Sequence, residues 1–352
     1  MSDTQKTQRI ILFDALKLFA IFLVLWGHVI QHLLSSDYQD EPVYRHIYSF
    51  HMPLFMMITG YFYAKTFRKG FAKSIAHRFR QLLLPAITWT VIFCFLQTFK
   101  MGLPSINSIV NGWIYNFWFL KSAFLCSVIC YPICKLHNYR YLSGGVIICA
   151  SQFIYGDNHL QLAFMIPCFI VGIWLQYNDN RVIHATSNKA LIVITGSIAI
   201  LGNLFLDSSL YRQMTEAFLL PICQLPTIIL LRVFRLALGI SGSLFIMLLF
   251  KAIFDRFKDP QKVRLITLLG SETLGVYILQ TYIVEYFLAR HLNLDSLNFT
   301  VCNFVIAPII SLIVLALSVM IIKGFKRNQF LAFALFGSKL HRRPTKVPVL
   351  DK

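Results

Sequence analysis

The stretch ILFDALKLFAIFLVLWGHVIQHLL, residues 11–34, decides the fold because it is long and apolar enough to cross a lipid bilayer as one helix. Ionisable residues interrupt it, among them Lys17 and His28. A helix rises about 1.5 Å per residue, so eleven residues return His28 to the face of Lys17, about 16 Å further along the axis. Ionisable groups inside a membrane span are costly and are functional by default. The stretch therefore predicts a polar seam that runs along the first helix from one leaflet towards the other.

The composition extends this interpretation to the whole chain of 352 residues, of which 57% are hydrophobic and 14% charged. The mean hydropathy is +0.64. Apolar runs near 20 residues recur without alternation of period two, which predicts an all-α, polytopic integral membrane helical bundle and not a β-barrel. We expect about ten transmembrane helices, at residues 11–33, 46–66, 82–100, 117–136, 142–157, 160–177, 189–206, 233–254, 267–289 and 300–322. The first apolar run lacks a cleavage site and is expected to remain as a span. We expect one transmembrane domain, residues 1–322, and a short basic tail, residues 323–352.

The formal charge of +18 is distributed unevenly between the expected loops. Of the 33 lysines and arginines, 25 lie in alternate segments of the chain, namely 1–10, 65–81, 135–141, 178–189, 251–264 and 323–352. This is the positive-inside bias, which also attracts anionic lipid headgroups. It predicts that both termini are cytosolic and that the bilayer, and not nucleic acid, is the partner of the basic residues.

Residues 207–232 are the least regular part of the expected topology because Pro221 and Pro226 break an apolar stretch. This segment is either an interfacial or re-entrant piece on the outer side or a span of its own. The cysteines lie mostly in apolar runs and are expected to be small buried packing residues. We therefore expect no metal site.

Two histidines are candidates for chemistry. His28 lies about a turn and a half from the outer end of the first span, and His51 lies at a similar depth in the second span. A short loop joins these spans, so the two side chains are expected to face each other. Histidine titrates near neutrality and is the commonest general base. The alternative is that each histidine only hydrogen-bonds a backbone carbonyl or hydroxyl in the bundle.

Further polar and aromatic residues mark the two ends of the seam. Asp14 and Lys17 are spaced to pair on one helix face, either as an interfacial ion pair or as an anion site. Arg78 and Arg80 end the densest basic run, which either signals topology or binds a phosphate-bearing donor. The outer ends carry Glu285 and an aromatic cluster around Trp118, which is either an interfacial belt or a surface that stacks on sugars.

Five ordered motifs resemble the membrane acyltransferase 3 family, most closely its fucose 4-O-acetylase-like branch. They are DALKLFAIFLVLWGH at Asp14–His28, SFHMPLFMMITGY at Ser49–Tyr61, RFRQLLLP at Arg78–Pro85, NFWFLKS at Asn116–Ser122 and ETLGVYILQ at Glu272–Gln280. The first is similar to the family's basic-residue-x10-His signature. Three positions depart from the family pattern: Thr59 replaces a serine, Gln81 an arginine and Gln280 a late histidine. We therefore leave Gln280 out of the expected catalytic set.

The resemblance implies a bacterial inner-membrane O-acetyltransferase that moves an acetyl group from cytosolic acetyl-CoA to a hydroxyl of a lipid-linked or surface glycan. It implies His28 as base or acyl carrier, with His51 orienting it. Asp14 would position Lys17, which would bind the donor with Arg78, Arg80 and Thr59. Glu285 and Trp118 are the expected acceptor contacts. The alternative is a transporter or flippase of a lipid-linked glycan, although no inverted repeat supports it.

Overall fold

The computed structural model describes residues 3–34, 37–66, 70–101, 106–154, 159–178, 189–217, 220, 222–254, 260–292, 294 and 298–339. Within these ranges every regular element is a helix, which confirms the all-helical class. Four stretches are long and apolar enough to cross a membrane, namely Ile11–Leu34, Phe71–Leu96, Leu225–Phe254 and Cys302–Phe325. A fifth span results if the bent pair Lys189–Leu204 and Ser208–Glu216 counts as one. A multi-pass membrane protein fits these findings, whereas the count of about ten spans and the side of each terminus stay predictions.

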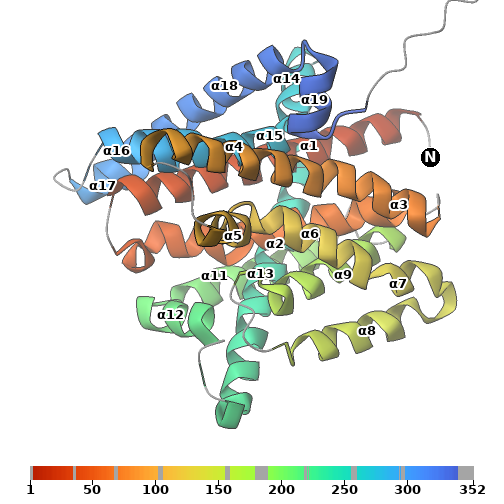
Figure 1. The fold of residues 1–352 in the computed structure, drawn as a ribbon. Helices are drawn as coiled ribbons and strands as arrows, with labels where there is room; N and C mark the ends of the chain where they lie inside the picture. Colours follow the sequence, from red (N-terminus) through yellow and green to blue (C-terminus); the bar gives the residue numbers. More distant parts are fainter. Residues whose placement is uncertain are drawn as a thin grey trace, which may run out of the picture.

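The helices follow one another with short connections (Figure 1). The N-terminal half contains α1 (Asp3–Val29), η1 (Ile30–Leu34), η2 (Tyr38–Asp40), α2 (Pro42–Thr66), α3 (Phe71–Arg78), η4 (Phe79–Leu83), α4 (Leu84–Met101), α5 (Ile106–Tyr115), α6 (Trp118–Ile129), α7 (Tyr131–Lys135), η5 (His137–Tyr139), α8 (Arg140–Ser151) and α9 (Leu162–Tyr177). The C-terminal half contains α11 (Lys189–Leu204), α12 (Ser208–Glu216), η7 (Ile222–Gln224), α13 (Leu225–Phe254), α14 (Pro260–Ser271), α15 (Thr273–Gln280), η8 (Thr281–Leu288), α16 (Ala289–His291), α17 (Phe299–Val301), η9 (Cys302–Ile306), α18 (Ala307–Phe325) and α19 (Gln329–Phe336).

Helix α2 lies at the centre of the bundle and packs against α1, α9 and α13 (Figure 1). Its contact with α9 is close enough to require glycine on both helices. A Cβ added at Gly60 would lie 2.1 Å from the carbonyl oxygen of Phe169, and one added at Gly172 would lie 2.0 Å from that of Met57. Small residues at helix crossings let backbones approach in this way in membrane proteins. The α2–α9 pair is therefore a rigid platform for the side chains on the other face of α2.

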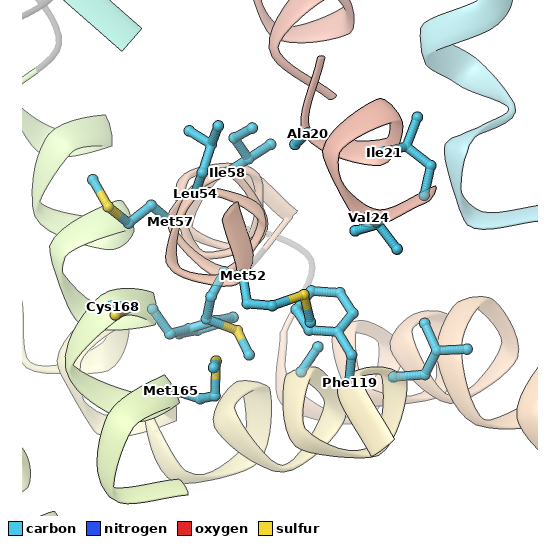
Figure 2. Packing of buried hydrophobic residues seen from close by; sticks show 14 of the residues in the cluster. Ala20, Ile21, Val24, Met52, Leu54, Met57, Ile58, Phe119, Met165 and Cys168 are labelled. Carbon is cyan, nitrogen blue, oxygen red and sulfur yellow. The ribbon is translucent and has the colours of Figure 1, made fainter. Parts of the chain in front are cut away.

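The apolar core gathers around α2 (Figure 2). Met57 points from α2 towards α9, Leu54 points upwards beside Ile58, and Met52 extends beside the ring of Phe119 from α6. Ile21 and Val24 approach from α1, and Met165 from α9. All of these side chains are buried. Five cysteines are buried, as expected of packing residues, namely Cys126, Cys130, Cys134, Cys168 and Cys302, whereas Cys149 and Cys223 are exposed, contrary to that expectation.

The third predicted span differs from the structure at its start. We predicted residues 82–100, preceded by a basic loop, but the helix is already continuous from Phe71 through α3, η4 and α4. Pro85 removes one backbone donor from this helix, and the wider π turns of η4 lie directly before it. As a result Arg78 and Arg80 are fixed on a helix and do not lie in a loop.

Two C-terminal regions were only partly anticipated. In the irregular segment 207–232, α12 is bent by 104° from α11. Pro226 lies in the first turn of α13, where proline is tolerated. Pro221 lies outside the described residues.

Within the predicted tail, α19 packs against α4, and the indole of Trp89 donates to the Leu335 carbonyl at 2.9 Å. Residues 340–352 of that tail lie outside the described residues. The helix α19 forms because its apolar side chains bury against α4.

Candidate functional site

Two cavities of about 580 and 590 Å³ lie along the seam of α1. The histidine cavity, of about 580 Å³, contains His28, His32, His51, Glu285, Gln280, Trp118 and Arg235 in its lining. The cationic cavity, of about 590 Å³, contains Lys17, Arg78, Arg80, Lys326, Thr59 and Gln81 in its lining. Met52 and Tyr277 line both. The two cavities therefore adjoin at these two side chains.

Helix α1 connects the two cavities because Lys17 lines one and His28 the other. Both residues belong to the single helix α1, so the spacing of about 16 Å along its axis applies directly. Asp14 lies one turn before Lys17, and its Oδ1 is 2.6 Å from the Lys17 Nζ. The carboxylate restrains the ammonium group at the mouth of the seam.

The centre of the histidine cavity is a cluster of His28, His32 and Glu285. The Nδ1 of His28 is 3.2 Å from Glu285 Oε1, and the Nε2 of His32 is 4.0 Å from the same oxygen. The two imidazole rings stack with centroids 5.7 Å apart. A carboxylate beside Nδ1 favours the tautomer that carries its proton there, which leaves Nε2 of His28 free to accept another proton.

Two π-helical segments bring this cluster together. His32 lies in η1 and Glu285 in η8, and these segments pack against each other. A π-helical turn rotates the residues that follow it relative to an α-helix, and such turns are frequent at functional sites. The cluster therefore depends on local geometry that a regular helical projection of the sequence does not contain.

His51 and Gln280 lie on the wall of the same cavity. His51 is 2% exposed, and its Nδ1 donates to the carbonyl of Ile47 at 2.7 Å, which leaves Nε2 as an acceptor. The prediction that His51 orients His28 or shares its proton stays a prediction: both residues line this cavity, and the Glu285 carboxylate lies beside the His28 ring. Gln280, which we left out of the catalytic set, is 1% exposed and points Nε2 at Glu285 Oε1, 3.5 Å away. It belongs to the environment of the His28–Glu285 pair.

The cations of the cationic cavity divide into two kinds. Lys17 is paired with Asp14, and the Lys326 Nζ is 2.5 Å from the Glu272 carboxylate. Arg78 and Arg80 have no carboxylate partner among the described residues. Arg78 lies over the ring of Tyr63, with 5.4 Å from Cζ to the centroid, and the Nη2 of Arg80 is 3.0 Å from the Nδ1 of His77. The Nε groups of both arginines are buried without a hydrogen-bond partner in the described chain. These two guanidinium groups are available to an anionic ligand.

The other predicted site residues also line a cavity. The hydroxyl of Thr59 donates to the carbonyl of Phe55 at 2.8 Å, so its remaining capacity in the cationic cavity is that of an acceptor. Gln81 stands beside Arg80 on the same wall. Trp118 lines the histidine cavity at the start of α6, next to Phe117, whose φ of 54° is unusual for a bulky residue. The aromatic residues at this helix start are therefore held in a fixed, strained backbone.

The boundary between the cavities is apolar and narrow. Phe119 lines the cationic cavity, and its ring centroid lies 5.9 Å from that of Tyr277 and 5.9 Å from that of Phe55. Met52 lies against Phe119 in Figure 2 and is 7% exposed. We call Met52, Phe119 and Tyr277 the constriction. Met52 and Tyr277 line both cavities, so these side chains lie where the two cavities adjoin.

A surface ion pair joins η2 and α12, and we call these two elements the cover of the histidine cavity. Residues from η2 and α12, including Tyr38 and Tyr211, line the cavity, and the Arg212 Nη2 donates to Asp40 Oδ2 at 2.8 Å between these two elements. This hydrogen bond from the guanidinium lowers the pKa of the Asp40 carboxyl from its usual value. The charged form of Asp40 therefore favours the closed arrangement of η2 and α12.

A metal ion is the one cofactor that this cavity has ligands for. The ligand atoms of His28, His32 and Glu285 lie within 4.8 Å of one another, and they form the only such group found in the described part of the chain. Two imidazole nitrogens and a carboxylate suit zinc. The same three groups also suit proton transfer without a metal, so the expected absence of a metal stays a prediction.

The comparisons with known proteins agree with the class of protein that this fold and these cavities indicate. Residues 10–323 match the family model described as "Acyltransferase domain", and the chain belongs to this acyltransferase 3 family. Two curated relatives are nodulation proteins NolL. The one from Mesorhizobium japonicum is 32% identical over 126 residues, which is 33% of this chain and 34% of the relative. The one from Sinorhizobium fredii is 30% identical over 209 residues, which is 53% of this chain and 54% of the relative.

The chain thus aligns with between a third and about half of the length of these relatives. No solved structure matches the chain. The family and the relatives support a membrane acyltransferase and give no support to the transporter alternative.

Proposed function

We propose that this protein is an integral membrane O-acyltransferase that moves an acetyl group from acetyl-CoA to a hydroxyl of a lipid-linked or cell-surface glycan. The family match supports acyl transfer. The acetyl donor, the glycan acceptor and membership of the fucose 4-O-acetylase-like branch are parts of the proposal. So is a bacterial inner-membrane location with both termini in the cytosol, which the positive-inside distribution of lysine and arginine supports.

One observation carries this proposal: a single helix connects a cavity that suits an anionic donor with a cavity that suits proton transfer. Arg78 and Arg80 offer guanidinium groups to the phosphates of CoA, and Lys17 offers an ammonium group near the thioester. His28 and Glu285 lie in the adjoining cavity. CoA is too polar to cross a bilayer, whereas its flexible pantetheine arm can carry an acetyl group through the constriction.

The reaction then balances with the residues present. The Nε2 of His28 accepts the proton of the acceptor hydroxyl, and the oxygen attacks the thioester carbonyl carbon. An ester C–O bond forms, the C–S bond breaks, and the CoA thiolate takes the proton from His28. Glu285 holds the Nδ1 proton and stabilises the imidazolium. In the alternative route Nε2 attacks the thioester first, the C–S bond breaks and CoA leaves as the thiolate. The acceptor oxygen then attacks the acetyl carbon, the C–N bond to His28 breaks, and the hydroxyl proton passes by way of Glu285 to the CoA thiolate.

Variants that lose either acetyl-CoA binding or acetyl transfer, but not both, test the proposal. In proteoliposomes that contain labelled acetyl-CoA and crude surface glycan, we expect His28→Ala to lose about 10²–10⁴-fold in transfer, because general base catalysis contributes that much, while acetyl-CoA binding stays unchanged. We expect the double variant Arg78→Ala, Arg80→Ala to lose binding instead. Transfer by His28→Ala at the wild-type rate would overturn the role of His28, and no binding of acetyl-CoA by the wild type would overturn the function.

A further inference from the structure

Arg235 on α13 is a charge that the proposed acyl transfer does not use. It lines the histidine cavity and lies within the apolar stretch Leu225–Phe254, which is long enough to cross a membrane. An arginine in such a stretch is costly unless a partner or a ligand compensates it. The contacts of Arg235 therefore decide whether it is structural or functional.

The contacts of Arg235 leave most of its guanidinium unused. Its Nη2 donates to Gln161 Oε1 at 2.7 Å, and its Cζ lies 4.2 Å from the centroid of the Phe164 ring. Neither partner is charged, and within the described ranges no carboxylate pairs with it. A guanidinium has five N–H donors in one plane. One face of the Arg235 guanidinium lies on the Phe164 ring and one of its N–H groups is bonded to Gln161. Its other N–H groups can therefore donate to a ligand in the cavity.

The neighbouring Arg232, one turn earlier on α13, shows the contrast. Its Nη1 donates to the carbonyl of Gln152 and its Nη2 donates to the carbonyl of Ile154 at 2.9 Å. These bonds tie α13 to the end of α8. The hydrogen bonds of Arg232 are therefore structural, whereas Arg235 is held only by the Gln161 amide and the Phe164 ring.

The residue that holds Arg235 has an unusual backbone. Gln161 has φ 49° and ψ 39°, in the left-handed region that non-glycine residues rarely adopt. Gln161 and Phe117 are the only non-glycine residues with positive φ in the described chain, and both line the histidine cavity. Strained backbone persists where the surrounding structure requires it, and it clusters at ligand sites. Here it aims the amide oxygen that orients Arg235.

We propose that Arg235 binds an acidic group of the acceptor, a carboxylate or a phosphate, in the histidine cavity, so that the acceptor is an anionic glycan or is linked through a phosphate. This inference rests on the proposed function for the identity of the ligand as an acceptor. A guanidinium stacked on a ring and held at one edge matches a two-oxygen anion by paired hydrogen bonds. The anion would also supply the counter-charge that Arg235 lacks.

Ligand-induced thermal stabilisation of the purified full chain tests the inference. The probes are glucuronate, with glucose as its neutral match, and inorganic pyrophosphate, all at ionic strength balanced with NaCl. Ligands that bind the native state raise the unfolding midpoint. We expect glucuronate or pyrophosphate, but not glucose, to stabilise the wild type. A response to glucuronate alone assigns an acidic sugar, and a response to pyrophosphate alone assigns a phosphate linkage.

The variants locate the response. We expect Arg235→Met to raise the apparent Kd for the active anion about tenfold or more, because hydrogen bonds to charged groups are the strong ones. Arg235→Lys keeps the charge and retains part of the response. The control Arg290→Lys, at an exposed arginine that lies over the Tyr286 ring and lines neither cavity, retains all of it. An equal response of Arg235→Met and the wild type, or no response of the wild type to either anion at 50 mM or so, would overturn the inference.

Stabilisation by CoA in the same assay separates this inference from the proposed function. We expect the CoA response to depend on Arg78 and Arg80 and to be unchanged in Arg235→Met. Loss of the anion response with a normal CoA response is therefore specific to Arg235. A wild type that responds to the anions but not to CoA would instead contradict the donor assignment and leave the anion site in place.

Discussion

The two cavities are almost equal in volume, about 580 and 590 Å³, yet different ionisable side chains line them. The cationic cavity presents Arg78 and Arg80 without a carboxylate partner in the described chain, and its one lining carboxylate, Glu272, is bound to Lys326. The histidine cavity places the carboxylate of Glu285 against His28. The first arrangement suits an anion, and its histidine, His77, contacts Arg80, whereas the second pairs a histidine with a carboxylate.

The difference teaches how one helix can serve a transfer across a membrane. In the reaction that we propose, the polar donor binds at one end of α1 and the proton is transferred at the other end, with Met52, Phe119 and Tyr277 between them. Separate sites allow a variant to damage one step and spare the other. The predictions below use this separation.

Removal of the carboxylate in the histidine cavity is expected to have the largest effect. Glu285→Gln keeps the size of the side chain but loses the charge that stabilises the His28 imidazolium. We expect transfer to fall about a hundredfold or more at unchanged KM for acetyl-CoA. Asp207→Asn is the matched control, because it makes the same change at a helix N-cap that asparagine also fills. A raised KM for the donor with unchanged kcat would contradict the assignment.

Removal of Arg78 or Arg80 should weaken binding of the donor in the cationic cavity. We expect Arg80→Ala and Arg78→Ala each to raise the KM for acetyl-CoA about tenfold to a hundredfold, since a hydrogen bond to a charged group contributes about 1.5–3 kcal/mol. The kcat at saturating donor should change little. The exposed Arg327→Ala serves as control because Arg327 lines neither cavity. Steady-state kinetics decide, and a fall in kcat alone would show that these arginines do not bind the donor.

The constriction should control the size of the acyl group. Met52→Ala shortens a side chain that lines both cavities, so we expect the ratio of butyryl-CoA to acetyl-CoA turnover to rise about tenfold. Release of CoA from each donor measures this ratio. Met320→Ala, at a position that is 63% exposed, should leave it unchanged. If Met52→Ala kept the wild-type ratio, the boundary that we draw between the cavities would not limit passage.

The cover of the histidine cavity should respond weakly to acid. The pKa of Asp40 is lower in the folded chain than in the unfolded chain, so its pair with Arg212 stabilises the cover above pH 4 or so, and this contribution is lost as the pH falls through the folded pKa. We expect hydrogen exchange in α12 to quicken as the pH falls below about 4, after correction for the intrinsic pH dependence of exchange. Asp40→Asn should show no such pH effect, and an equal pH effect in that variant would refute the role of the pair.

Removal of metal ions is expected to leave acetyl transfer unchanged. If His28, His32 and Glu285 act in proton transfer, chelation with EDTA leaves transfer unchanged, while excess Zn²⁺ inhibits because it occupies the Nε2 of His28. Activity assays before and after dialysis against EDTA test this. Loss of activity that one added metal restores would instead make the cluster a metal centre.

The sequence contains much of this site but not its assembly. The spacing of Lys17 and His28 is a helical period, and the expected donor residues lie where the family motifs place them. His32 follows His28 by four residues on one helix face, so its position was a usable signal. Its approach to Glu285 depends on two π-helical segments, which no hydrophobic pattern encodes. The fold of α19 onto α4 is likewise tertiary, because the seven apolar residues that follow Gln329 in the basic tail have no periodic signal of their own.

Sidedness of transfer tests the central claim most directly. Labelled acetyl-CoA is enclosed in proteoliposomes, crude surface glycan is supplied outside only, and wild type is compared with His28→Ala. The account predicts label on the external glycan with the wild type and almost none with the variant, because the acetyl group passes from the cationic cavity to His28. External label at equal rates with both proteins, or labelling only after the vesicles are lysed, would contradict it.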